Sequence, residues 1–308
     1  MKFLQNTVSE SRMALPCTAV YAICIWLLAG LLQENWWIQF AIFAVCTYLM
    51  VELNNANALL RIYSRMVSCT FLVLSCTACF MFGSLSGAVT ELCIIASYYT
   101  LFHSYQDKRA TGWTYYTFLL LGLSSMVCVH IVFFLPLLWL LMASKIQSLS
   151  WRAFFASLLG LTTPYWFAGV YFIFTEDYET PMGHFSKLGE FGIPFDFSQL
   201  SVPQLIVYVF MFVLALTGII HYIRTRYRDK IRIRMLFDCF IFTDLLTFLL
   251  LALQPQHYDM LMRLIIINTS PLLAHFIALT HTRWTNIAFY VITVAALIVT
   301  ALCLFNIS

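Results

Sequence analysis

The residues best placed to do chemistry are the ionisable side chains that interrupt long apolar runs. Glu91 and Arg263 each lie within about two helical turns of the end of such a run. Glu34 lies in the short turn after the first run, so we expect these three residues at a common depth in a membrane. Asp259 precedes Arg263 by four residues, a spacing that allows an ion pair on one helix face. Because a charge inside an apolar span is costly, each of these residues indicates a site or a pair.

Carboxylates and cations in such positions suit glycosyl transfer from a lipid-linked donor. A transferase that uses a polyprenyl-phosphate donor needs a carboxylate base to activate an acceptor hydroxyl and a cation to neutralise the phosphate leaving group. The candidate bases are Glu34, Glu91 and Asp177. The candidate phosphate clamps are Arg263 and Lys187.

A structural interpretation competes with this catalytic one. Glu91, Asp244 and Arg263 would simply satisfy one another inside a helix bundle. Glu34 stands close to Trp36, where a solvated carboxylate at a membrane interface needs no further explanation.

Two histidines lie deep in apolar runs, and such positions are typical of haem ligands or of residues that relay protons. A bis-histidine haem usually draws on ligands at matched depth, whereas His130 falls near the outer face and His275 nearer the cytoplasm. A histidine bonded to a neighbouring carbonyl or serine is the simpler interpretation of each. The sequence therefore identifies no cofactor.

The densest charge feature is the run RTRYRDKIRIR, which holds six cations: Arg224, Arg226, Arg228, Lys230, Arg232 and Arg234. Attraction of such a run to anionic lipid headgroups is worth about 1 kcal/mol per residue near the surface. Because the run lies between two apolar segments, we interpret it as a topology determinant and lipid anchor and not as a nucleic-acid site. Lys187, on the predicted opposite side, is a further anion contact.

Composition sets the class of protein. Hydrophobic residues make up 62% of the 308 residues and charged residues only 10%, against about 25% charged in an average soluble domain. At about 20 apolar residues per crossing, the chain has room for about ten crossings and no separate soluble domain. We therefore predict an all-α polytopic transmembrane helix bundle that forms a single membrane domain over residues 1–308.

Apolar segments occupy residues 14–32, 36–53, 64–83, 86–102, 113–142, 153–175, 201–223, 236–253, 258–280 and 285–305. Short cytoplasmic connections retain Lys and Arg, and alternate connections are basic. The basic positions are Lys2, Arg12, Arg61, Arg65, Lys108, Arg109, Lys145, Arg152, the six-cation run and Arg283. The connections at 33–35, 84–85 and 254–257 contain neither Lys nor Arg. This alternation predicts a cytoplasmic N-terminus and an outward C-terminus.

Segment 113–142 is basic at both flanks, so it must cross an even number of times. Two crossings leave each arm with about fifteen residues, which span about 22 Å and fall short of a 30 Å hydrocarbon core. We predict a hairpin of short, tilted or re-entrant helices that turns near Cys128 to His130. With this hairpin the chain has about eleven segments.

The longest connection, at about 176–201, then lies on the outer side. It carries five acidic residues and one lysine, with aromatic residues between them: EDYETPMGHFSKLGEFGIPFDFSQLS. This composition is typical of a loop in the membrane interface with one short amphipathic turn.

Four stretches resemble a family of polytopic inner-membrane proteins of Bacteroidetes-type bacteria. They are NNANALLRIYSRMVSCTFLVL, FFLPLLWLLMA, SLSWRAFFASLLGLTTPYWFAGVYFIF and NTSPLLAHFIAL, and the resemblance covers most of residues 50–300. It implies the bacterial inner membrane of a Gram-negative host and supplies no catalytic residues. The many-helix layout is also similar to multi-spanning glycosyltransferases and O-antigen polymerases that use polyprenyl-linked sugars, a likeness of architecture alone.

Three functions remain open at this point. The first is an enzyme of cell-envelope glycan or lipid assembly, a glycosyltransferase or polymerase that acts on a polyprenyl-linked substrate at the outer side of the membrane. The second is a non-catalytic subunit or scaffold of a larger membrane protein complex, because no catalytic motif is recognisable. The third is a small-molecule transporter, which ranks last because the chain shows no internal repeat. Membrane lipids are partners in all three.

Overall fold

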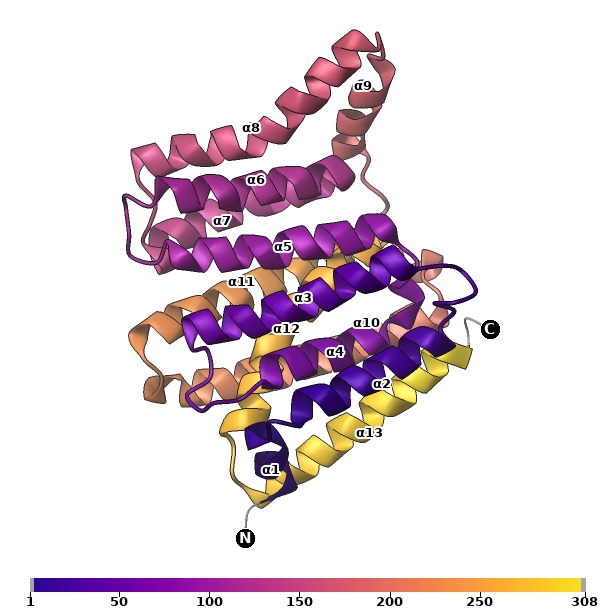
Figure 1. The fold of residues 1–308 in the computed structure, drawn as a ribbon, viewed down its shortest axis with the longest axis vertical. Coiled ribbons are helices and arrows are strands. Elements are labelled where there is room, and N and C mark those ends of the chain that lie inside the picture. The colour runs from indigo at the N-terminus through magenta and orange to yellow at the C-terminus, as the bar shows by residue number, and fades with distance from the viewer. Residues whose placement is uncertain (1–2, 306–308) are drawn as a thin grey trace.

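The computed structural model describes residues 3–305, and every regular element in that range is a helix (Figure 1). Lys2, one of the topology-setting cations, lies outside the described residues, as do the last three residues of the predicted outward C-terminus. The α-helices are α1 Leu4–Glu10, α2 Ala14–Leu28, α3 Trp37–Asn57, α4 Met66–Thr77, α5 Leu85–His103, α6 Thr111–Val127, α7 Leu135–Leu141, α8 Trp151–Phe174, α9 Glu179–Ser186, α10 Val202–Thr225, α11 Ile231–Leu253, α12 Tyr258–Leu279 and α13 Arg283–Phe305.

Eight helical stretches within residues 3–305 are long and apolar enough to cross a membrane, and a ninth results if the bent pair α1 and α2 is one span. This architecture is compatible with an integral, multi-pass membrane protein, as the composition predicts. The total of eleven crossings and the side that each terminus faces stay predictions.

Serine side chains start several of these helices. Ser84 accepts a hydrogen bond from Gly87 N at the start of α5, and Ser150 accepts one from Ala153 N at the start of α8. Ser201 and Gln204 form a capping box at the start of α10. Each cap satisfies backbone N–H groups that the first turn of a helix leaves unpaired.

Helix α12 is the centre of the bundle. Every residue of α12 from Met260 to Ala278 is buried, and α12 packs against α4, α5, α10 and α11. By contrast, only 22% of the corresponding stretches of α8 and α13 is buried. A helix that is buried on every side can place polar side chains only against other protein groups, so the polar residues of α12 must find partners within the bundle.

The predicted cytoplasmic connections gather at one end of the bundle, here called the inner end. Contacts between connections that are far apart in sequence define it: Arg61 Nε to Asp229 Oδ1 (2.8 Å), Arg232 Nη2 to Asn57 Oδ1 (2.9 Å), Gln106 N to Ile146 O (2.8 Å), Ser150 Oγ to Lys108 O (3.0 Å) and Asn6 Nδ2 to Thr280 O (2.9 Å). The helices run between this end and the opposite one (Figure 1).

The predicted outward connections gather at the opposite end, here called the outer end. The contacts are Gln39 Nε2 to Gly83 O (3.2 Å), Ser84 Oγ to Asp259 Oδ2 (3.2 Å), His130 Nε2 to Lys187 O (3.0 Å), Gln256 Nε2 to Glu190 O (3.0 Å) and Phe195 N to Ala252 O (3.2 Å). The grouping of connections by charge thus matches their grouping in space.

The segment 113–142 forms a hairpin, as predicted. Its chain reverses at Cys128, which is extended between α6 and the 3-10 helix η2 Val129–Phe134. The arms are longer than the apolar segment because α6 begins at Thr111 and the second arm continues to Ile146 through α7 and the π-helical turn η3 Met142–Ile146. The arms therefore have 17 and 18 residues, which suits two short crossings.

Several boundaries differ from the predicted segments. Helix α4 has only 12 residues, and the 3-10 turn η1 Cys79–Met81 completes the predicted segment 64–83. Helix α11 begins at Ile231 rather than at 236, so Arg232 and Arg234 belong to its first turn and not to a loop. Helix α1 was not predicted, and it lies at 92° to α2.

Candidate functional site

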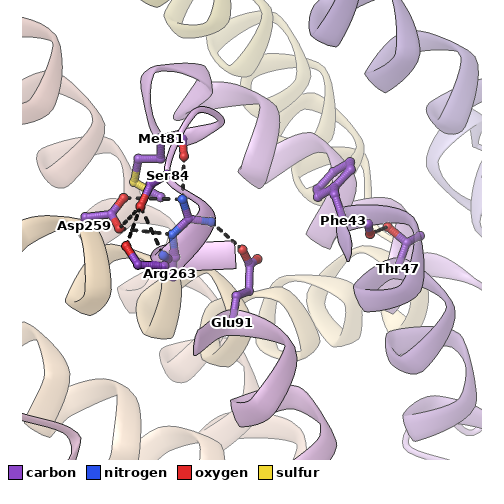
Figure 2. A network of polar contacts seen from close by, with 9 residues as sticks. Phe43, Thr47, Met81, Ser84, Glu91, Asp259 and Arg263 are labelled. Carbon is purple, nitrogen blue, oxygen red and sulfur yellow. Dashed lines mark hydrogen bonds and ion pairs between the residues drawn. The ribbon is translucent and has the colours of Figure 1, made fainter. Parts of the chain in front are cut away.

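A cluster of charged side chains lies at the outer end, centred on Arg263 (Figure 2). Its guanidinium donates from Nη1 to Glu91 Oε2 at 2.7 Å and from Nη2 to Met81 O at 2.5 Å. Asp259 accepts two longer contacts, 3.5 Å from Nε and 3.4 Å from Nη2. The expected depth match of Glu91 with Arg263 and the expected i,i+4 pair with Asp259 are both present. Three elements, α5, η1 and α12, meet in this cluster.

The start of α5 fixes the geometry of the cluster. Ser84 caps α5 and donates its own Oγ–H to Asp259 Oδ2 at 3.2 Å. One turn later Gly87 passes against the ion pair, where a Cβ atom would lie 2.4 Å from both Arg263 Nε and Asp259 Oδ2. Only glycine leaves room for the guanidinium at this point.

The three charged groups differ in their access to solvent. The side chains of Arg263 and Glu91 are 6% and 7% exposed, whereas that of Asp259 is 42% exposed. Of the five N–H donors of the guanidinium, those of Nε and Nη2 and one of Nη1 already have partners. A phosphate would have to displace Glu91 or Asp259 to bind Arg263. Asp259 is therefore the member of the cluster that can meet a ligand.

Asp259 opens onto a polar cavity of about 190 Å³. The cavity lies between the start of α5, the turn of the α6–α7 hairpin and the start of α12, and it is lined by Ser86, Gly87, Thr90, Val127, Cys128, Gln256, His257, Asp259 and Met260. Hydroxyl, amide, imidazole and carboxylate groups are all present on its walls. We call it the polar chamber.

A second cavity of about 250 Å³ adjoins the polar chamber and is mostly apolar. Its walls are His130, Phe133, Phe134, Phe191, Leu250, Gln254, His257, Met260 and Leu261. We call it the apolar chamber. His257 and Met260 line both chambers, and the His257 ring lies 3.6 Å from the His130 ring, centroid to centroid. The two histidines thus stand at the boundary between an apolar and a polar space.

The long connection at 176–201 covers the apolar chamber. Phe191 reaches its wall, and Gly192 N donates to Gln254 Oε1 at 2.8 Å. Two histidines fix the connection to the hairpin, because His130 Nε2 donates to Lys187 O and His184 Nε2 donates to Ser125 O at 3.1 Å. The connection contains the predicted short helix, α9, none of whose residues is buried.

The other predicted bases lie away from this cluster. Glu34 is exposed in the turn between α2 and α3. Asp177 accepts hydrogen bonds from Thr180 N and Thr180 Oγ1 at 3.1 and 2.6 Å, at the start of α9. These bonds stabilise the carboxylate and lower the pKa of Asp177 below its usual value. Asp177 therefore stabilises the start of α9, and its lowered pKa makes it a weaker base.

The structural interpretation of the charged residues needs one correction. Asp244 does not belong to the Arg263 cluster, because its hydrogen-bond partner is Thr269 Oγ1, at 3.4 and 3.2 Å from the two carboxylate oxygens. Its place on α11 lies deeper in the bundle, where it is fully buried. The position of Asp244 along its apolar segment predicted its approximate depth in the membrane, but not which neighbouring helix its side chain faces.

Two cations of the predicted lipid anchor also make contacts between helices. Arg226 lies 3.6 Å from Asp238, and Arg232 donates to Asn57 and lies over the Tyr105 ring. These two contacts join the inner ends of the helices. Four of the six cations are exposed: Arg224, Arg228, Lys230 and Arg232. Lys187, the predicted outer anion contact, is exposed in the 3-10 turn η4 Lys187–Gly189, and its backbone oxygen accepts from His130 of the apolar chamber.

Sequence reasoning did not assign a role in chemistry to Asp259 and His257. The i,i+4 spacing from Arg263 identified Asp259 only as a partner. His257 lies just before an apolar run, and nothing in the sequence indicates that it lies at the boundary of two cavities. Within residues 3–305, no three His, Cys, Asp or Glu side chains are grouped so as to hold a metal ion.

Comparison of the chain with protein-family models, with curated proteins and with solved structures gave no match in any of the three.

Proposed function

We propose that this protein is an inner-membrane enzyme of cell-envelope glycan or lipid assembly that takes a polyprenyl-linked substrate at its outer end. One observation carries the proposal: an apolar chamber and a polar chamber share a wall of His257 and Met260. A lipid-linked sugar has the same division into an apolar chain and a polar head, and ligand sites are mostly apolar with a few placed polar groups. The apolar chamber receives the end of the prenyl chain, and the polar chamber receives the head.

The exposed members of the site define the chemical roles. Asp259 takes the proton of an acceptor hydroxyl while the hydroxyl oxygen bonds to the anomeric carbon of the sugar. The bond from that carbon to the phosphate oxygen breaks, and its electron pair leaves with the phosphate. Lys187, an exposed cation in the turn that bonds His130, neutralises the leaving phosphate. Arg263 and Ser84 hold the Asp259 carboxylate in position.

The test is native mass spectrometry of the protein extracted gently from its own host. We expect the wild-type chain to retain a polyprenyl-linked lipid. Leu250→Trp places an indole in the apolar chamber and should abolish retention. Leu249→Trp is the matched control, because Leu249 is 54% exposed on the lipid-facing side of the same helix. Equal retention by both variants, or no such lipid on the wild-type chain, would overturn the proposal.

A specific observation also favours the second function, a non-catalytic subunit of a membrane complex. Beyond Pro164, helix α8 leaves the bundle and carries exposed aromatic residues: Trp166, Phe167, Tyr171 and Phe174 (Figure 1). The same mass spectra test this alternative. A stoichiometric protein partner without a polyprenyl-linked lipid supports the subunit.

A further inference from the structure

The middle of the bundle holds a carboxyl group that the proposed reaction does not use. Asp244 is fully buried, and Thr269 supplies its hydrogen bond. Basic side chains on the elements packed around it have other partners in the described chain: Lys145 pairs with Asp238, and Arg263 with Glu91 and Asp259. The His275 imidazole contacts Asp229. A buried carboxylate without a cation is costly, so an ionisable group of this kind is by default a functional one.

The groups around Asp244 are polar but uncharged. Tyr98 of α5 donates its hydroxyl to Asn268 Oδ1 at 2.7 Å, next to Thr269 on α12. Tyr98 and Cys239 are the titratable neighbours in this layer of the bundle. The amide Nδ2 of Asn268, which is fully buried, has no protein partner within residues 3–305. A free donor and a lone carboxyl group in one layer point to a small polar ligand.

Two small cavities lie between the helices on the outer side of and beside this layer, and each is about 20 Å³, enough for one water molecule. One lies toward the outer end, where Ser75, Glu91 and Arg263 are the hydroxyl and charged groups among mostly apolar walls. The other has Ser97, Tyr98, Thr117 and Thr243 among mostly apolar walls, and Thr243 directly precedes Asp244 in α11. Ser75 Oγ has no protein partner within the described chain and is free to bond a water.

Charged clusters stand at both ends of this layer. Outside is the Arg263 cluster. Inside, His275 Nε2 lies 3.2 Å from Asp229 Oδ2, and the other carboxylate oxygen, Asp229 Oδ1, lies 2.8 Å from Arg61 Nε. Along α12, Thr269 is six residues from Arg263 and six from His275, or about 9 Å of rise in each direction. Two or three waters in hydrogen-bonded sequence cover such a gap at about 2.8 Å per bond.

We propose that Asp244 is the central proton-binding group of a water-linked path along α12, which carries protons between the two ends of the bundle. A proton enters from water at one end, binds the Asp244 carboxylate and leaves to water at the other end. Only O–H bonds form and break, so no oxidant, reductant or further reactant is required. The path is a function separate from lipid-linked transfer and uses a different central residue.

The experiment uses the purified full chain in liposomes that contain a pH-sensitive dye. A potassium gradient with valinomycin sets a membrane potential, and the dye reports proton entry. Wild-type protein should acidify the lumen faster than protein-free liposomes do. Asp244→Asn keeps the size of the side chain and should reduce the rate to that of protein-free liposomes. Asp107→Asn, at an exposed residue of the inner end, is the control and should match the wild type.

A second variant keeps the test decisive if Asp244→Asn fails to fold. Tyr98→Phe removes only the hydroxyl that bonds Asn268 and should slow proton entry without loss of the folded protein in size-exclusion chromatography. A wild-type rate equal to that of protein-free liposomes overturns the proton path. A wild-type rate in folded Asp244→Asn overturns the assignment of Asp244. Retention of a polyprenyl-linked lipid is unaffected by either result, so the two proposals fail separately.

Discussion

Arg263 is the residue on which the outer cluster depends, because it is the cation that two carboxylates of the cluster share. We expect Arg263→Met to leave Glu91 buried without a partner and to lower the free energy of unfolding by about 3–5 kcal/mol. Unfolding of the purified protein in mixed micelles measures the loss. The double variant Arg263→Met with Glu91→Gln should recover part of it, because no uncompensated charge then remains.

Arg283→Met is the matched control, since Arg283 is an exposed arginine at the inner end. Its effect should stay within about 0.5 kcal/mol, as for most surface substitutions. If Arg263→Met were equally mild, the guanidinium would not be compensating a buried charge.

Asp259 is the residue that the proposed transfer needs as a base. Asp259→Asn keeps the shape of the side chain but cannot take a proton, so we expect transfer to fall by about 10²–10⁴-fold. The readout is the glycan and lipid profile of a host strain that carries only the variant. Glu34→Gln and Asp177→Asn should leave that profile unchanged, because both residues lie outside the chamber walls. Loss of product with Glu34→Gln would move the site to the first outward turn.

For single residues, the sequence predicts the depth of a side chain in the membrane well, but it predicts poorly which neighbour that side chain faces. The positions of Glu91 and Arg263 within their apolar runs predicted a common depth, and in the structure the two residues form an ion pair. The same reasoning grouped Asp244 with them, because distance along a run does not say which neighbour a side chain faces. The partner of Asp244, Thr269, depends on how α11 packs against α12, which no local pattern records.

Among the elements, α6 and α8 make the closest contact, and small residues allow it. A Cβ atom on Gly160 of α8 would lie 2.4 Å from Tyr115 O of α6, so the two backbones touch there. We expect Gly160→Ala to force the helices apart at a cost of about 1–3 kcal/mol. Gly169→Ala on the same helix is the control, because no atom lies within 4 Å of its added Cβ. Thermal stability in detergent compares the two, and equal midpoints would exclude the close contact.

The charges that flank an apolar segment predict whether it crosses the membrane an odd or an even number of times. Basic residues on both flanks of 113–142 required a reversal, and the structure reverses at Cys128. Helix α1 could not be predicted in the same way, because its hydrogen bonds go to the distant Thr280 and Asn286. Its polar residues Gln5 and Asn6 are buried in the fold.

For the whole molecule, the separation of the connections into two ends follows from the distribution of Lys and Arg. The inner end contains the six-cation run and the outer end contains Lys187 and the acidic residues of the 176–201 connection. Because short cytoplasmic connections retain Lys and Arg, this asymmetry predicts that the inner end faces the cytoplasm. What charge alone could not predict is that Arg226 and Arg232 also join helices to one another.

Accessibility of single cysteines tests the orientation and the hairpin together. We expect Ser186→Cys, in the outer connection, to react with a membrane-impermeant maleimide in cells whose outer membrane is permeabilised. Asp107→Cys and Ser144→Cys flank the hairpin at the inner end, so both should react only after the inner membrane is broken. The unsubstituted chain, whose ten free cysteines lie in or beside helices, gives the background.

The pair Asp107→Cys and Ser144→Cys is the sharper half of this test. The two positions flank the hairpin. A backbone hydrogen bond of 2.8 Å, from Gln106 N to Ile146 O, joins the chain just before the hairpin to its last residue. Two points so joined must face the same solution. Reaction of both from outside, with Ser186→Cys protected, would invert the whole chain and leave the hairpin intact. Reaction of only one of them would require an odd number of crossings between the two positions. That result would contradict the hairpin, because the hydrogen bond from Gln106 N to Ile146 O holds both positions at the same end of the bundle.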